Sequence, residues 1–427
     1  MSKVAIVGAG FTGLSAAVYL TERGNQVVIF EAGQKLGGLA EGFNPSTGSG
    51  QVQWEWNLES FYHHIFTNDQ EIISLAKKVG WPMEEKEPLT MSFVGGREIQ
   101  LDSPMSLLNF KAISFWARIR MGFGLALLKL VQNGISLEKY KATKVLPVLL
   151  GKEGYQMIWE KLLKAKFGPY VDEVNMAWFW ARVTKRTKNL GYFEGGFQKL
   201  ANKIGEYIEK NGGEIRLKTE IATVRNTETR NDGTKGVLVN GEEFDAVIMT
   251  VPAPIAERLI GKIEMPKINY LWGQTLILEL KNKLIKGYWL NILEKDYPFL
   301  VVVEQTNLID KNKYGNKHII YLGNYLADGD PRLSMDKDEL LKLYLPYLKK
   351  INKEFKNGWV ERSFLFRKPY AQPVFPINYS KKLPQIKVEN KPIYLANMSM
   401  VYPFDRGTNY AVKMGTEVAE MVLTDLR

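Results

Sequence analysis

The sequence predicts an α/β protein in which a parallel sheet is assembled from separated segments of the chain and lies beside an α+β second domain. The first observation is local: residues 1–31 hold an apolar run, a glycine-rich turn, a helix-forming stretch and a second apolar run. The second is long-range: similar apolar runs return at 244–251 and 393–396. The sheet must therefore combine segments that are far apart in the chain.

The first 31 residues form a βαβ unit with a dinucleotide fingerprint. Two buried strands, 3–7 (KVAIV) and 26–30 (QVVIF), enclose a helix over 14–23. The alternative is a glycine-rich turn that binds no ligand. The dinucleotide fingerprint is favoured because both strands, the glycines, the helix and the acid occur together in one segment. The glycines permit the tight turn, the close approach of a pyrophosphate and helix packing, and the acid is placed to accept both ribose hydroxyls. The candidate nucleotide contacts are Gly8, Ala9, Gly10, Phe11, Thr12, Gly13, Glu31 and Ala32.

Composition narrows the class of protein. The chain has 427 residues, enough for two domains with large cores. It has no cysteine and three histidines, which excludes disulfides, thiolate catalysis and an imidazole-rich metal site, so no metal is predicted. A net charge of +11 suggests an anionic partner or surface, although we expect no nucleic acid. The N-terminus already belongs to the fold, so we expect a cytoplasmic protein. Contact with the inner face of an anionic membrane is a further option. The sequence leaves the oligomeric state open.

A second pair of glycines follows the acid, in Lys35-Leu36-Gly37-Gly38-Leu39-Ala40. Together, GAGFTGLSAAVYLTERG and VVIFEAGQKLGGLAEGF resemble the N-terminal signature of the FAD-dependent amine oxidase superfamily. That group includes monoamine oxidases, protoporphyrinogen oxidases, phytoene desaturases and, more distantly, UDP-galactopyranose mutases. The resemblance implies FAD, bound by a Rossmann-type, glutathione-reductase-like domain, and it adds Gly37, Gly38 and Leu39 to the cofactor contacts. Amine oxidases usually carry a basic residue where this chain has Leu39.

Two later segments carry the same resemblance. A strand over 214–224 ends where the family's backbone pairs with adenine, which implies a contact at Val224. After the strand at 393–396, a loop and a helix from 410 to 423 resemble the C-terminal flavin motif, which implies contacts at Arg406, Thr408 and Asn409. The usual Gly-Asp of that loop reads Asn397-Met398 here, so only the loop backbone is carried over.

The segments that carry the fingerprint define the expected domains. Residues 1–60, 188–267 and 386–427 form the predicted FAD-binding domain, and 61–187 and 268–385 form the predicted substrate domain. There is no second glycine-rich fingerprint in the sequence. We therefore expect no separate NAD(P)H domain, and the organic substrate itself would reduce the flavin.

Four residues are candidates for the catalytic cavity. Adjacent side chains on a strand face opposite sides, so either one of His63 and His64 packs while the other is exposed, or one of them lies beside the flavin. His64-Ile65-Phe66 is similar to a flavin-flanking segment of the sugar mutases. Tyr402 and Arg406 flank the C-terminal loop, where Tyr402 would stack a substrate against the flavin. Arg406 would pair with an anionic group of the substrate or with the flavin itself, or else form a structural salt bridge with Asp405 or another neighbour.

The segment 106–132 is the least usual part of the chain. Its helix is apolar around most of its circumference and also carries Lys111, Arg118, Arg120 and Lys129. It is either a core helix of the second domain or a basic, apolar surface that meets lipid. Trp178, Trp180 and Arg182 either line a cavity or fill the core.

These features favour an FAD-dependent oxidoreductase whose flavin accepts a hydride from an organic substrate that is large, hydrophobic or lipid-linked. No lysine in 270–310 fits the flavin-bridging lysine of amine oxidases, which argues against simple amines. The alternative is a redox-neutral nucleotide-sugar mutase similar to UDP-galactopyranose mutase, in which reduced flavin is the nucleophile. A flavin-binding protein without catalysis is the third interpretation.

Overall fold

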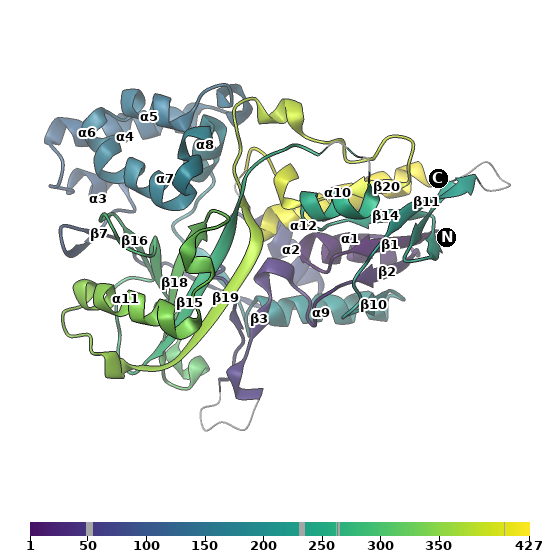
Figure 1. Ribbon diagram of the computed structural model, residues 1–427, viewed down its shortest axis with the longest axis horizontal. Coiled ribbons are helices and arrows are strands. Elements are labelled where there is room, and N and C mark those ends of the chain that lie inside the picture. Colours follow the sequence, from purple (N-terminus) through teal and green to yellow (C-terminus); the bar gives the residue numbers. More distant parts are fainter. Residues whose placement is uncertain (48–53, 230–234, 262, 264, 405) are drawn as a thin grey trace.

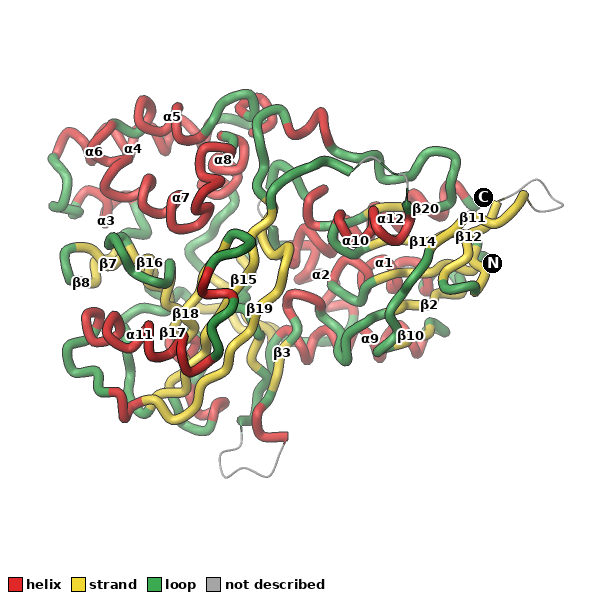
Figure 2. Tube along the Cα trace, viewed as in Figure 1, coloured by secondary structure: helices red, strands yellow, loops and turns green. Residues whose placement is uncertain are grey.

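A computed structural model describes residues 1–47, 54–229, 235–261, 263, 265–404 and 406–427 (Figure 1). One sheet and its helices lie near both chain termini, on the right of Figure 1. A second sheet and a layer of helices lie on the left. Figure 2 shows the same division, with strands at the centre of both parts and helices around them.

The first sheet is parallel, with the strand order β10-β2-β1-β14-β20. It combines strands from the beginning, the middle and the end of the chain, as the predicted domain requires. The two N-terminal strands begin and end where the sequence predicts. The five strands are β1 (Lys3–Val7), β2 (Gln26–Phe30), β10 (Glu214–Arg216), β14 (Ala246–Met249) and β20 (Ile393–Leu395).

Helices cover one face of this sheet, and a small antiparallel sheet together with one further helix, α10, covers the other. The strand expected over 214–224 is interrupted, because β10 ends at Arg216 and the next strand begins at Val224. The segment Asn231-Asp232-Gly233 has a sequence typical of a hairpin turn, but it lies outside the described residues. The covering elements are α1 (Phe11–Thr21), α2 (Gln70–Lys78), α9 (Phe197–Lys210), α10 (Ala253–Ile260), α12 (Thr408–Asp425), β11 (Val224–Thr229), β12 (Lys235–Val239) and β13 (Glu242–Phe244).

The second sheet has seven strands in the order β19-β15-β18-β17-β16-β7-β8. Residues 90–100 thereby join the later segment 270–373, and α11 packs on one face through an apolar cluster. The longest strand, β19, is absent from the sequence-based expectation. The elements are β7 (Thr90–Val94), β8 (Arg97–Gln100), β15 (Tyr270–Leu280), β16 (Trp289–Ile292), β17 (Val301–Glu304), β18 (His318–Leu326), β19 (Val360–Pro373) and α11 (Lys337–Ile351).

A layer of helices lies above the second sheet in Figure 1. The helix expected over 106–132 is two helices, each capped by a serine: Ser103 for the first and Ser114 for the second. Among the described residues, no helix combines the length and apolar character needed to cross a bilayer. The layer contains α3 (Pro104–Leu108), α4 (Phe115–Leu130), α5 (Ala142–Leu149), α6 (Lys152–Gly154), α7 (Glu160–Phe167) and α8 (Met176–Thr184).

Short strands form two further small sheets, one of two strands and one of three. They are β3 (Gly42–Phe43), β4 (Leu58–Glu59), β5 (Ile65–Phe66), β6 (Met83–Lys86) and β9 (Leu190–Phe193). Parallel and mixed sheets with helices on their faces confirm the predicted α/β class.

Candidate functional site

A cavity of about 780 Å³ lies where the parallel sheet, the second sheet and the helical layer meet. The loops that follow β1, β2, β14 and β20 form one end of its wall, and α7, α8 and the second sheet form the other. In a parallel sheet these loops leave the carboxyl ends of the strands, which is where such sheets bind ligands.

Two glycine-rich loops meet at the sheet end of this cavity. Gly8 has φ of +108°, a conformation that L side chains rarely adopt. A Cβ atom at Gly13 would lie 2.0 Å from the carbonyl oxygen of Gly8, so the helix packs this closely only with glycine there. A Cβ atom at Gly38 would lie 3.1 Å from the Cα of Gly10. The two loops therefore present bare backbone to the cavity, as a bound pyrophosphate requires.

Glu31 holds the first of these loops in place. Its Oε2 accepts a hydrogen bond from the N–H of Ala9 at 2.8 Å, and its Oε1 accepts one from Gly33 at 2.7 Å. A carboxylate has about four acceptor positions, so each oxygen can accept a further bond. Because Glu31 and Ala32 also line the cavity, a ribose held there would find an acceptor already oriented.

Two helices begin at the cavity. Phe11 and Thr12 at the start of α1, and Thr408 and Asn409 at the start of α12, belong to its lining. The helices contact each other closely, because Ser15 Oγ donates to the carbonyl oxygen of Val412 at 3.0 Å. Helix N-termini carry unpaired N–H groups and partial positive charge, so this end of the cavity favours a negatively charged ligand.

Buried polar atoms in the wall fit a polar cofactor. Nδ2 of Asn397 is buried and has no hydrogen-bond partner among the described residues, and the buried hydroxyl of Tyr270 lies within reach of the Ser399 side chain. Both residues line the cavity. A buried donor without a partner is costly, and the polar groups of a bound dinucleotide would supply one. The glycine loops, Glu31 and these atoms together fit the flavin dinucleotide that the sequence predicts.

Both adjacent histidines line the cavity, and both are half-buried. They precede β5, so strand alternation does not separate them, and the expectation that one would be exposed is wrong. His63 Nδ1 donates to the carbonyl oxygen of Phe61 at 2.6 Å, which leaves Nε2 as an acceptor. Burial lowers the pKa of His63 to about 4 and that of His64 to about 3, so both rings are neutral near pH 7.

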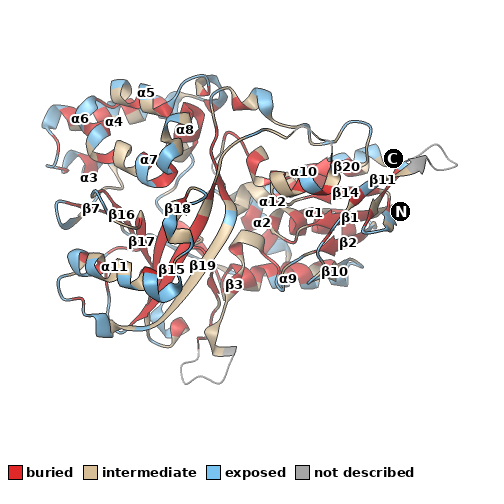
Figure 3. Cartoon of the chain, viewed as in Figure 1, coloured by how far each residue is buried: buried red, intermediate tan, exposed pale blue. Residues whose placement is uncertain are grey.

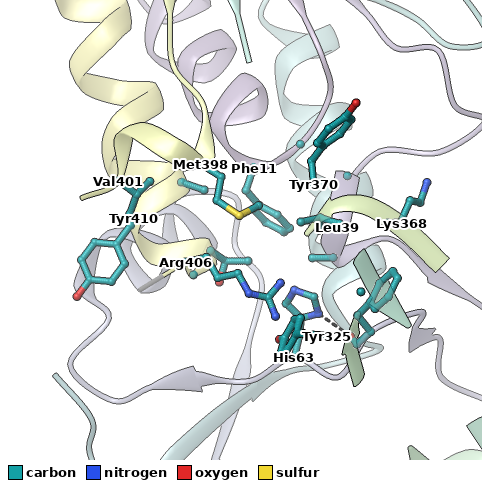
Figure 4. Close-up of a pocket in the computed structure, with 18 of the residues that line it drawn as sticks. Phe11, Leu39, His63, Tyr325, Lys368, Tyr370, Met398, Val401, Arg406 and Tyr410 are labelled. Carbon is teal, nitrogen blue, oxygen red and sulfur yellow. Dashed lines mark hydrogen bonds between the residues drawn. The ribbon is translucent and has the colours of Figure 1, made fainter. Parts of the chain in front are cut away.

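Arg406 lies beside His63, as Figure 4 shows. Its guanidinium carbon is 4.8 Å from the centre of the Tyr325 ring. Burial lowers the pKa of Arg406 from its usual range, while nearby Tyr62 acts in the opposite direction. An arginine keeps its charge under such a shift, so Arg406 places a positive charge in the cavity. Asp405, the alternative partner expected from the sequence, lies outside the described residues.

Tyr402 does not belong to the cavity wall, which corrects the expectation that it stacks a substrate. Its ring packs in the helical layer, 5.2 Å from the rings of both Phe375 and Tyr379. Its hydroxyl donates to Glu138 Oε2 at 2.9 Å and accepts from Asn175 Nδ2 at 3.0 Å. The side chain points away because these buried partners satisfy its hydroxyl.

Val224 also lies elsewhere. Its side chain is buried in the apolar cluster under the small antiparallel sheet, and its backbone pairs with Val239. It is not among the described residues that line the cavity, whereas Gly37, Gly38, Leu39, Arg406, Thr408 and Asn409 are. No lysine from the described part of 270–310 lines the cavity either, but Lys368 of β19 does, and its Nζ lies 3.3 Å from Glu41.

The far end of the cavity is aromatic and cationic. Lys166 Nζ lies 4.9 Å from the Trp178 ring centre and 5.1 Å from that of Tyr325. The guanidinium carbon of Arg182 lies 5.7 Å from the centre of the same Trp178 ring. Sequence reasoning missed Lys166 and Tyr325 and left Trp178 and Arg182 undecided; Trp178 and Arg182 line the cavity, and Trp180 does not. The sequence did carry a signal for this end of the cavity, namely the cations Lys166 and Arg182 within an aromatic and otherwise apolar helical region. Such cations indicate a site because buried charges need partners.

Known proteins resemble this chain along most of its length. It is 22% identical to 15-cis-phytoene desaturase of Glycine max over 82% of this chain and 65% of that protein. Its fold matches a protein assigned as a protoporphyrinogen oxidase from Exiguobacterium sp. 255-15, with a TM-score of 0.74 at 17% identity and 99% coverage of both chains. It also matches reduced UDP-galactopyranose mutase, with a TM-score of 0.76 at 17% identity over 99% of this chain and 96% of that one.

The family itself follows from a longer match. The model of the family described as flavin containing amine oxidoreductase matches residues 11–423, which include both glycine loops and both helices that begin at the cavity. The resemblance inferred from the sequence is thereby confirmed. The protein belongs to the flavin-containing amine oxidoreductase family.

Proposed function

We propose that the flavin of this protein is FAD and that the enzyme oxidises a large, predominantly hydrophobic organic substrate. The observation that carries the proposal is the two-ended cavity. One end presents glycine backbone, an oriented carboxylate and two helix N-termini, and the other is walled by aromatic and apolar side chains. When bound, FAD supplies the chemistry, by accepting a hydride from a C–H bond of the substrate.

In this scheme the residues of the chain bind the FAD and orient it. Glu31 accepts hydrogen bonds from the ribose, and the backbone of Gly10 and Gly38 leaves room for the pyrophosphate. The N-terminus of α12 favours negative charge at the flavin end. With a pKa of about 4, His63 is a neutral hydrogen-bond acceptor rather than a proton donor at neutral pH.

The substrate end supports a hydrophobic molecule. Apolar and aromatic side chains from the helical layer and the second sheet form this wall: Trp159, Leu162, Leu163, Phe179, Trp289 and Leu300. The Glycine max relative is named for its action on 15-cis-phytoene, which agrees with such a substrate. Lys166, Arg182 and Arg406 in the same cavity favour a substrate that also carries an anionic group.

A redox-neutral nucleotide-sugar mutase is the second candidate. The same cations and rings favour it, because a nucleotide diphosphate offers both negative charge and a ring that can stack. The fold similarity to UDP-galactopyranose mutase agrees with this candidate but concerns the fold alone.

Anaerobic mixing separates the two candidates. The purified holoenzyme is titrated without oxygen against candidate substrates of each class, and the flavin absorbance is followed. Bleaching by a hydrophobic organic compound, with formation of its desaturated or oxidised product, supports the oxidoreductase. Turnover of a nucleotide sugar only after dithionite reduction, with the flavin still reduced at the end, overturns it in favour of the mutase.

A further inference from the structure

An exposed apolar stripe runs along α4. Trp116, Ile119, Phe123, Leu127 and Leu130 follow one another at intervals of three or four residues, which places them on one face of the helix. Trp116 is 77% exposed, Phe123 65% and Leu130 76%. Neighbouring exposed apolar side chains on α3, at the start of α4 and on α5 extend the stripe: Met105, Leu108, Phe115 and Val148. We call these nine residues the α4 surface.

The α4 surface is separate from the face through which α4 packs against the core. The opposite side of the same helix already supplies its core contacts through Ala117, Met121, Gly124 and Leu128, which are buried. The Cβ position at Gly124 lies only 2.7 Å from the carbonyl oxygen of Leu149, so α4 is already packed as closely as its backbone allows. Helix α4 therefore has two apolar faces, and only one of them is used by the fold. Figure 3 shows exposed residues in pale blue on the helices of this layer.

The surroundings of the α4 surface are strongly basic. Residues 103–152 contain one acid, Glu138, and its carboxylate is buried against Ser380 and Tyr402. The same segment accounts for most of the net charge of +11 of the chain. Its cations are Lys111, Arg118, Arg120, Lys129, Lys139, Lys141, Lys144 and Lys152.

We propose that the α4 surface docks onto the headgroup region of an anionic lipid bilayer. Exposed Trp, Phe and Leu side chains surrounded by Lys and Arg are the pattern of a helix that lies in the membrane interface. A second copy of the chain fits the surface less well, because a symmetric contact would place the same cations opposite each other. Anionic headgroups instead complement the cations, while the acyl region accepts the apolar stripe.

The position of α4 links this surface to the cavity. Helix α4 packs against α8, and α8 supplies Trp178, Phe179 and Arg182 to the cavity wall. One layer of helix therefore separates the docked surface from the substrate end. A hydrophobic substrate dissolved in the bilayer would lie close to the enzyme that uses it. The docking itself does not depend on the proposed reaction.

Vesicle sedimentation tests the proposal with the intact holoenzyme. The protein is mixed at low salt with vesicles of phosphatidylglycerol and phosphatidylcholine, or with phosphatidylcholine alone. We expect co-sedimentation with the anionic vesicles that weakens as salt is raised. Trp116→Glu/Phe123→Glu should lower the partition coefficient by about tenfold or more, because two apolar anchors are lost. Lys111→Gln/Lys129→Gln should lower it by about tenfold, and only on the anionic vesicles.

Matched controls lie on other surfaces. Met421→Glu changes an exposed apolar residue of α12, and Lys349→Gln/Lys350→Gln removes two exposed charges of α11; both should partition as the wild type does. Far-UV circular dichroism checks that each variant is folded. The proposal is overturned if the wild type ignores anionic vesicles at low salt or if Trp116→Glu/Phe123→Glu binds them equally well. It is also overturned if light scattering shows a wild-type dimer that this variant converts to monomers.

Discussion

Ser15 and Gly415 bring the two helices that begin at the cavity into backbone contact. A Cβ atom at Gly415 would lie 2.0 Å from Ser15 Oγ and 2.1 Å from the carbonyl oxygen of Thr12. Only glycine leaves room for this approach, and the hydrogen bond from Ser15 Oγ to Val412 spans the same contact. The N-termini of α1 and α12 are held side by side because their helices meet at this point.

Gly415→Ala should therefore push α12 away from α1. We expect the free energy of unfolding to fall by about 1–3 kcal/mol, as in other overpacked cores, and the purified protein to retain less flavin. Thermal unfolding and flavin absorbance per chain measure the two effects. Gly122→Ala is the control, because its Cβ would meet only Leu107 Cδ2, at an ordinary 3.8 Å. Equal stability and flavin content in both variants would contradict the assigned contact.

Tyr402→Phe tests the correction to the cavity wall. The hydroxyl of Tyr402 is hydrogen-bonded to Glu138 and Asn175, so its removal should lower the free energy of unfolding by about 1–3 kcal/mol. The spectrum of the bound flavin and the rate of its reduction by substrate should not change. Chemical denaturation and anaerobic stopped-flow absorbance are the measurements. A slower reduction at unchanged stability would return Tyr402 to the cavity.

Arg406→Gln, unlike Tyr402→Phe, should change the rate of flavin reduction. The guanidinium lies in the cavity beside His63 and close to the Tyr325 ring, so its loss should leave the flavin bound and slow its reduction by an anionic substrate. A lost charged contact of this kind corresponds to a decrease of about tenfold or more. Lys350→Gln, an exposed charge on α11, provides the control. Reduction at the wild-type rate would remove Arg406 from the substrate site.

The two half-buried histidines of the cavity predict how stability depends on pH. Their pKa values are lowered to about 4 and about 3 from an ordinary value near 6.5, so between these limits the unfolded chain binds protons that the folded chain does not. Stability from this source is complete above pH 6.5 and is lost as the pH falls, at up to about 1.4 kcal/mol per histidine and pH unit. His63→Gln and His64→Gln should each flatten the curve of unfolding free energy between pH 6.5 and 5. Unchanged slopes in denaturant titrations would contradict the assigned burial.

Local sequence signals predicted the nucleotide end of the cavity. Glycine spacing, apolar runs and an acid at a strand end depend on neighbours in the chain, and β1, β2 and the lining positions Gly10, Gly38 and Glu31 agree with them. Helix α12 begins two residues before the predicted start, which places Thr408 and Asn409 at its N-terminus.

Long-range contacts decided the features that the sequence left open or predicted wrongly. Tyr402 is hydrogen-bonded to Glu138 and Asn175, which both lie more than 200 positions away in the chain. Tyr402 itself lies in an irregular loop, which has no periodicity to show where a side chain points. For α4, apolar residues on both faces leave core and surface interpretations equally compatible with the pattern. Only the positions of α5 and α8 show which face is covered.

Flavin content tests the central claim most directly. The purified protein is denatured by heat, and the released flavin is identified and counted by chromatography. We predict one FAD per chain, released without covalent attachment. Glu31→Ala should weaken FAD binding by about 1–3 kcal/mol, roughly ten- to a hundredfold, through lost ribose hydrogen bonds and a less ordered glycine loop. Colourless protein that takes up no added FAD would contradict the account.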